Sequence, residues 1–310
     1  MRRPLLVALA LASVTLSGCA PALEGPSAPI AREQVPIAPA LAGASSRRTV
    51  LDFVEAYASS PLDGSAALAD LVTGDELERW VYWLGVQNAQ FPGRIDGEAE
   101  VRNVAFIGTT PANRALGAQV ELGATVTFTF APVDDDPFER ARILDGPVTL
   151  LSSRPGDWRV LDITRDGVPM SEGIELFEDE ERADRGISVR LDSLFMFTPN
   201  WQFNVVVENR SGTEIGLDAL ATGLFFERTG GTFDRVEGAP SPALASIPEG
   251  TGVQSLVSFP LQDSADGLVL VLTFLRDGRP SRFDFPLEDL VTVVPPPPPT
   301  AGGDAERTTG

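Results

Sequence analysis

Apolar residues in the early part of this chain recur with the period of a helix. They fall in three groups, at residues 51–58, 68–72 and 77–84, and the third group repeats at i, i+3, i+4 and i+7. That spacing is typical of a helix with one buried face. Thr73 and Glu76, just ahead of the third group, match the pattern of a capping box. We therefore expect three short helices.

Beyond these helices the period changes from that of a helix to that of a strand. Apolar and polar residues alternate over 116–130, which predicts a long strand with one buried face. At about 3.3 Å per residue it would run roughly 50 Å, so we expect a bulge or bend at Gly123. Two further runs, 148–152 and 158–163, flank Arg154-Pro155-Gly156-Asp157. Proline followed by glycine suits a type II turn, which predicts a hairpin.

The second half of the chain carries short strands. Alternating runs over 187–294 are separated by turn signals about every 8 to 12 residues, which is typical of a β-sandwich. Residues 170–186 are acidic and lack a period, so we predict an acidic linker between this domain and a first domain at 49–169. Two other segments are expected to be disordered: the Ala-, Pro- and Ser-rich tether 19–48 and the Pro-rich tail 295–310.

The N-terminus has the composition of a secretory signal. Met1-Arg2-Arg3 is followed by an apolar run from Leu5 to Leu16 and then by small residues. Because this run is shorter than the roughly 20 apolar residues that cross a bilayer, we interpret 1–18 as a cleaved signal peptide.

The segment Leu16-Ser17-Gly18-Cys19 resembles the lipobox of bacterial lipoproteins. The resemblance implies cleavage between Gly18 and Cys19 and transfer of a diacylglyceryl group, with palmitate-type chains, to the Cys19 thiol. Two acyl chains anchor a protein stably where one does not. We therefore expect a lipid anchor on the extracytoplasmic face of a bacterial cell membrane, whether inner, outer or single. The alternative is an ordinary secretory signal followed by an unrelated cysteine.

Two resemblances suggest a fold class. Residues 49–169 are similar to the ketosteroid-isomerase and nuclear-transport-factor-like family in helix order, in the long strand and in the final hairpin with Gly156-Asp157-Trp158-Arg159-Val160. That family implies helices closing over a curved sheet around a pocket. Residues 187–294 resemble Ig-like modules of bacterial lipoproteins through Val205-Val206-Val207-Glu208-Asn209. The expected class is an α+β cone followed by an all-β Ig-like sandwich.

Charge and composition narrow the chemistry. The chain has a net charge of −20, no histidine and one cysteine, and all of its 24 basic residues are arginines. This field opposes nucleic acid and anionic headgroups as partners. Without histidine or a free thiol, the usual catalytic triads and His- or Cys-ligated metal sites are excluded, and we expect no cofactor. The acidic runs 134–136 and 178–181 do not match an EF-hand, so solvated loops are favoured over calcium sites.

Aromatic residues of the third helix are the candidates for a ligand pocket. Trp80 belongs to the apolar stripe and is expected in the core, whereas Tyr82 and Trp83 fall off it and are pocket or interface candidates. We expect a non-enzymatic binding or scaffold lipoprotein of the cell envelope, with an envelope protein, a glycan or a small apolar ligand as partner. The alternative is a carboxylate-based isomerase or hydrolase-like enzyme in the first domain, with Tyr57, Tyr82 and Asp96 as its candidate polar groups.

Overall fold

The structure is a computed structural model that describes residues 39–291 apart from 113–114, 155, 198 and 229–231. The predicted signal peptide, Gly18 and Cys19, and most of the predicted tether and tail lie outside the described residues. The described part belongs to one compact unit. Among its helices, none is long and apolar enough to cross a membrane.

Helical segments in the described part are few and unequal in length. They are α1 (Pro39–Asp63), α2 (Ala66–Ala69), α3 (Asp75–Gln90), α4 (Met170–Gly173) and a 3₁₀ turn, η1 (Pro242–Leu244).

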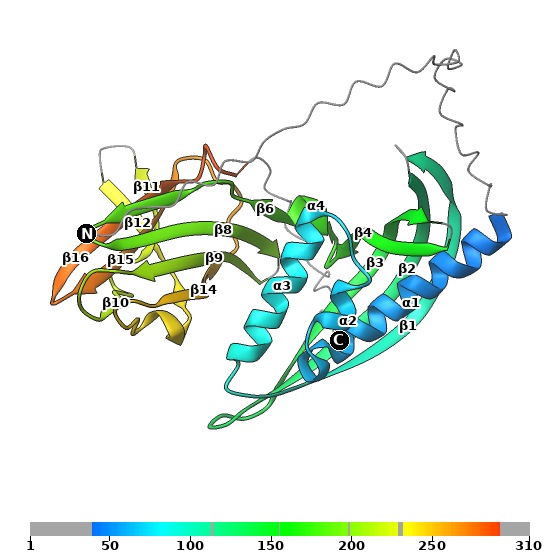
Figure 1. The fold of residues 1–310 in the computed structure, drawn as a ribbon, viewed down its shortest axis with the longest axis horizontal. Coiled ribbons are helices and arrows are strands. Elements are labelled where there is room, and N and C mark those ends of the chain that lie inside the picture. Colours follow the sequence, from blue (N-terminus) through cyan, green and yellow to red (C-terminus); the bar gives the residue numbers. More distant parts are fainter. Residues whose placement is uncertain (1–38, 113–114, 155, 198, 229–231, 292–310) are drawn as a thin grey trace, which may run out of the picture. The chain divides into compact units, whose positions relative to one another are not determined.

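One antiparallel sheet holds the first five strands in sequential order (Figure 1). Its strands are β1 (Gly93–Ala112), β2 (Ala115–Pro132), β3 (Phe138–Arg154), β4 (Asp157–Arg165) and β5 (Val168–Pro169). The predicted hairpin between β3 and β4 is confirmed, and Gly156 takes a φ of 83° there. Side chains on one face of β2 are buried, as the alternation predicts.

Two further antiparallel sheets contain the remaining strands. One is formed by β13 (Ala239–Pro240), β14 (Gly252–Pro260), β9 (Asn200–Asn209), β8 (Ile187–Phe197), β6 (Ile174–Leu176) and β7 (Glu181–Asp184). The other is formed by β10 (Ile215–Leu217), β15 (Leu268–Arg276), β11 (Gly223–Arg228), β12 (Thr232–Glu237) and β16 (Arg279–Pro286). Both contribute to one apolar core, in which Trp201 and Phe203 pack with Phe274 and Phe285.

The predicted fold class is wrong. The described chain is mostly β, with three antiparallel sheets, rather than an α+β cone of three helices followed by an Ig-like sandwich. Helix α1 runs along β1 and β2, but α2 is a single turn (Figure 1). Helix α3 is tied through Arg79 and Trp83 to Asp192 on β8. The apolar spacing predicts that a helix has a buried face, but it does not specify which element covers it.

Two local expectations also differ from the structure. The capping box is absent, because the backbone of Thr73 bonds to Val160 of β4 and Gly74 becomes the N-cap of α3. Gly123 lies in regular register with β3, and the irregularity falls in β1, where Arg102 is the extra residue opposite it. Position 102 therefore carries the bend that was expected in β2.

The predicted tether and linker overlap with ordered elements. Helix α1 begins at Pro39, so 39–48 is helical, and Ala42 and Ser46 are fully buried. The segment 170–186 contains α4, β6 and β7, with Met170 fully buried. The tether was predicted because alanine and serine lack a strong apolar signal, yet small residues suit close packing of a helix on a sheet. The linker was predicted because 170–186 is acidic and lacks a period.

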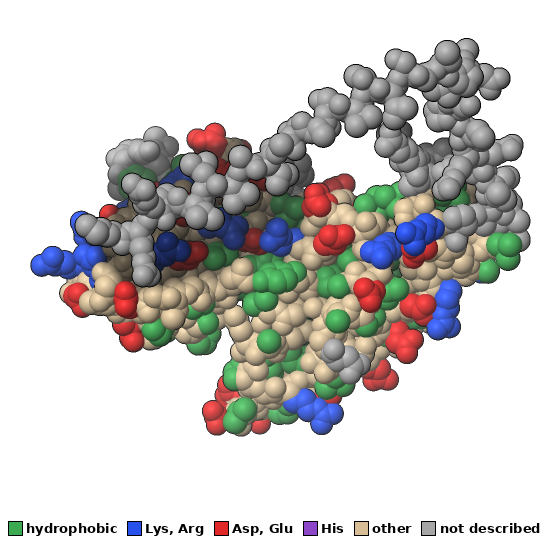
Figure 2. Space-filling view, in the orientation of Figure 1, with side chains coloured by type: hydrophobic (Ala, Val, Ile, Leu, Met, Phe, Trp, Pro, Cys, Tyr) green, Lys and Arg blue, Asp and Glu red, His purple; other side chains and the backbone are tan. Residues whose placement is uncertain are grey.

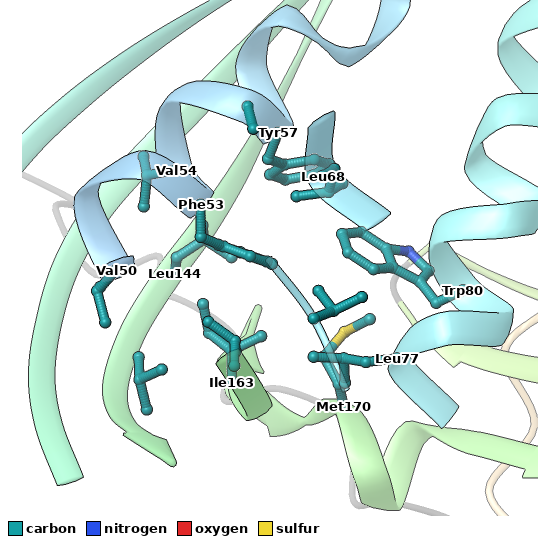
Figure 3. Close-up of a cluster of buried hydrophobic side chains, with 14 of the residues drawn as sticks. Val50, Phe53, Val54, Tyr57, Leu68, Leu77, Trp80, Leu144, Ile163 and Met170 are labelled. Carbon is teal, nitrogen blue, oxygen red and sulfur yellow. The ribbon is translucent and has the colours of Figure 1, made fainter. Parts of the chain in front are cut away.

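A second apolar core lies between α1, α3 and the five-stranded sheet. Figure 3 shows Phe53 and Tyr57 of α1, Trp80 of α3 and Leu144 of β3 turned toward one another. Trp80 is therefore a core residue, as predicted. Strand β8 adds Phe195 and Phe197 to this core, so the core extends beyond the first sheet.

Candidate ligand cavity

A cavity of about 330 Å³ opens at the edge of this core. Its lining residues come from α1, α3 and β1 to β4, and also from β8, β9, β13, η1 and β14. The volume lies near the lower end of the roughly 300–1,000 Å³ that small-molecule sites occupy.

Aromatic rings form much of the apolar wall. The rings of Tyr57 and Trp80 are 5.1 Å apart, and those of Tyr57 and Phe128 are 5.2 Å apart, both edge-to-face. Phe91 and Phe130 make a similar pair at 5.4 Å. Such pairs fix ring positions, so this wall is preorganised for an apolar or aromatic group.

Three arginines supply the charge. Arg140 and Arg142 lie two residues apart on β3 and therefore share a face of the strand. The strand register brings the third arginine close to these two. Arg165 of β4 pairs with Leu144 of β3, which is two residues beyond Arg142. The Arg140 guanidinium lies over the Phe130 ring, 5.6 Å from its centre.

One carboxylate holds two of these arginines in place. Asp166 lies 3.9 Å from the Arg142 guanidinium and 3.4 Å from that of Arg165. Asp166 also accepts the backbone N–H of Ile143 at 2.9 Å, which fixes its position. The side chains of Arg142 and Arg165 are only 17% and 11% exposed.

Burial lowers the pKa of the Arg142 guanidinium below its ordinary value, and repulsion from Arg165 and Arg140 adds to the effect. Tyr57 and Asp166 act in the opposite direction. The net lowering arises mainly because burial disfavours the charged form of the guanidinium.

The cavity wall contrasts with the rest of the protein. Among the described residues that line it there is no Asp or Glu, although the whole chain carries 44 acidic residues. Figure 2 shows acidic side chains interspersed with arginines over the visible face. Asn88 also lines the cavity, and its Nδ2 is buried without a hydrogen-bond partner within the described part.

A second hollow, between α1 and β1, has a different character. It is lined by Arg48 together with Asp52, Glu55 and Glu98. Arg48 and Asp52 already pair at 2.8 Å. Its charges can balance one another, so it does not show the one-sided charge of the first cavity.

The two aromatic residues predicted as pocket candidates do not line the first cavity. Trp83 is fully buried, and its Nε1 donates to Asp192 Oδ2 at 2.7 Å. Tyr82 is about half exposed and its hydroxyl bonds to the side chain of Gln254 on β14. Both residues join α3 to the sheet of β8, β9 and β14.

The arginines that line the cavity were missed by the sequence interpretation. A signal for two of them was present, because an Arg-x-Arg pair on a strand places both side chains on one face. Arg165 had no such signal, since only the pairing of β3 with β4 brings it close.

Neither a comparison with models of protein families nor one with curated proteins finds a match. Among solved structures, the chain is similar to the intermembrane space region of the chloroplast protein ARC6. That likeness has 10% identity and a TM-score of 0.30, and it covers 40% of this chain and 95% of that one. At this level the likeness carries no argument about function.

Proposed function

We propose that this protein is a lipid-anchored, extracytoplasmic lipoprotein of the bacterial envelope that binds a small, largely apolar molecule in the cavity between α1, α3 and β14. The observation that carries the proposal is the cavity of about 330 Å³ with its ordered aromatic wall. Well-formed apolar cavities with a few converging polar groups are the usual sites of small ligands.

The cavity chemistry favours binding over a carboxylate-based enzyme. Such an enzyme needs an acid or base within hydrogen-bond reach of its substrate. The lining residues that the structure describes include Tyr57 but no Asp or Glu. Asp96, the carboxylate considered for this role, is not among them and pairs with Arg94 at 2.7 Å.

The anchoring part of the proposal rests on the lipobox Leu16-Ser17-Gly18-Cys19. Mass spectrometry of the mature N-terminus should find Cys19 as the first residue, carrying a diacylglyceryl group. An unmodified thiol, or a mature chain that begins elsewhere, would contradict the anchor. Cys19→Ser should leave the protein uncleaved or release it to the medium.

Native mass spectrometry tests the binding part. The whole chain with Cys19→Ser, purified without detergent, should carry a noncovalent small-molecule adduct. Ser258 lies on the cavity wall and is partly exposed, so Ser258→Trp should fill the cavity and remove the adduct. Leu220→Trp, at a surface position that is 83% exposed, is the matched control and should keep it. An adduct that survives Ser258→Trp, or none in either protein, would contradict binding in this cavity.

A further inference from the structure

The charge of the cavity wall is opposite in sign to the net charge of the protein. Three arginines line it, and no Asp or Glu does so among the described lining residues, in a chain with a net charge of −20. A protein that is acidic overall repels anions at a distance. The local excess of arginine therefore makes this cavity a selective place for negative charge.

The two more buried arginines both contact the carboxylate of Asp166. Asp166 is not among the described residues that line the cavity, so the charged side chains of that lining are all arginines. Buried charges in proteins are usually balanced by partners. Burial is the main cause that lowers the pKa of Arg142, and repulsion from Arg165 and Arg140 adds to it.

We infer that the cavity takes an amphipathic carboxylate, with its anionic head against Arg142 and Arg165 and its apolar body among the aromatic rings of Tyr57, Trp80 and Phe128. This inference rests on the proposed binding function and adds the chemical class of the ligand. The guanidinium fork matches a carboxylate in plane and spacing, which gives two parallel hydrogen bonds.

The aromatic wall of the cavity indicates that the rest of the ligand is apolar. The rings of Tyr57, Trp80 and Phe128 present an apolar surface, and Arg140 caps the region near Phe130. Free phosphate would use the arginines and leave this surface uncovered. A dianion would also be opposed more strongly than a monoanion by the acidic field of the whole protein.

Isothermal titration calorimetry with a matched pair of probes tests the inference. The whole chain with Cys19→Ser is titrated with 2-naphthoate and with 2-naphthamide, which have the same ring system but differ in charge. We expect naphthoate to bind at least about tenfold more tightly, as one charge-assisted interaction would give. Inorganic phosphate, added as a competitor at the same concentration, should displace little naphthoate.

Variants locate the head group. Arg165→Gln should weaken naphthoate binding about tenfold and leave naphthamide binding nearly unchanged. Arg140→Gln, at an exposed position, should reduce the preference for naphthoate in the same direction. Arg159→Gln, also exposed and on the same strand as Arg165, removes the same charge away from the cavity and should change neither affinity. Thermal unfolding verifies that each variant is folded.

The outcomes separate the two proposals. Equal binding of both probes, unaffected by the arginine variants, would overturn the carboxylate assignment and leave the binding function standing. Full displacement of naphthoate by phosphate would replace the carboxylate with a general anion. Failure of both probes to bind would count against the proposed binding function as well.

Discussion

At the residue scale, Asp192 joins α3 to β8 through a group of polar contacts. Its buried carboxylate accepts from Arg79 at 2.7 Å and from Trp83 at 2.7 Å, and Arg190 lies 3.4 Å away. Asp192 is also the extra residue of a bulge in β8, between Leu191 and Ser193. A bulge changes the direction of the side chains in its strand. In β8 the bulge turns the Asp192 carboxylate toward Arg79 and Trp83 of α3.

Asp192→Asn should destabilise the protein by about 2 to 3 kcal/mol. Removing one member of a fully buried ion pair costs roughly 3–5 kcal/mol. The expected loss is smaller here because the side chains of Arg79 and Arg190 are 42% and 38% exposed and can be solvated. Urea unfolding of the two proteins measures the difference.

Asp284→Asn is the matched control for this prediction. Asp284 pairs with Arg282 at the same 2.7 Å, but both side chains are at least half exposed. Exposed pairs contribute about 0–1 kcal/mol, so this variant should remain close to the parent. Equal losses in the two variants would show that the contacts of Asp192 with α3 do not contribute to stability.

Single residues were the hardest feature to predict from the sequence. Trp83 was assigned to a pocket or an interface because it falls off the apolar stripe, and its partner Asp192 lies more than a hundred positions away. Arg165 joins Arg140 and Arg142 through the pairing of β4 with β3, which local spacing does not contain. Residues that share a strand or a helix face were predictable, and residues that meet through strand register were not.

At the scale of elements, α1 and β1 pack with almost no space between their backbones. A Cβ atom at Gly97 of β1 would lie 2.1 Å from the carbonyl oxygen of Ala58 in α1. Glycine at this position therefore sets how closely the helix can lie on the sheet. Figure 1 shows α1 following β1 along much of its length.

Gly97→Ala should cost about 2 kcal/mol, since the clash is with backbone and the helix must move as a unit. Gly108→Ala is the control on the same strand, because nothing lies within 4 Å of a Cβ there and its φ is not in the left-handed region. It should be neutral or stabilising by up to about 1 kcal/mol. Thermal unfolding of both variants measures the effect, and a Gly97→Ala protein as stable as Gly108→Ala would contradict this packing.

Elements with a strong period were predicted well, and elements that depend on packing were not. The alternation over 116–130 identified β2, and the Pro-Gly pair located the hairpin between β3 and β4. The first ten residues of α1 were taken for tether because Ala and Ser carry little periodic signal, although Trp158 donates to Ser45 at 2.9 Å. The error in fold class also arises from packing, which the period of a helix does not specify. Helix α3 packs one face on the core that contains Tyr57 and another face against β8.

At the scale of the whole described chain, β8 connects the two apolar cores. Before the bulge at Asp192, Val189 and Leu191 belong to the core of the two later sheets. After it, Leu194 and Met196 belong to that same core, while Phe195 and Phe197 belong to the core with α1. A shift of one residue exchanges the two faces of a strand, so beyond the bulge the even-numbered residues face the core of the later sheets and the odd-numbered ones face the core with α1. Neither core is complete without this strand.

Differential scanning calorimetry of the Cys19→Ser chain should therefore show a single unfolding transition, with equal calorimetric and van't Hoff enthalpies. The sequence predicted two independently folded domains at 49–169 and 187–294, and such domains would unfold in two transitions. Separately expressed fragments give the complementary test. Residues 39–169 lack Phe195 and Phe197, so this fragment should not show a cooperative transition. Two resolved transitions, or a fragment that unfolds cooperatively, would show that each core is stable without the shared strand.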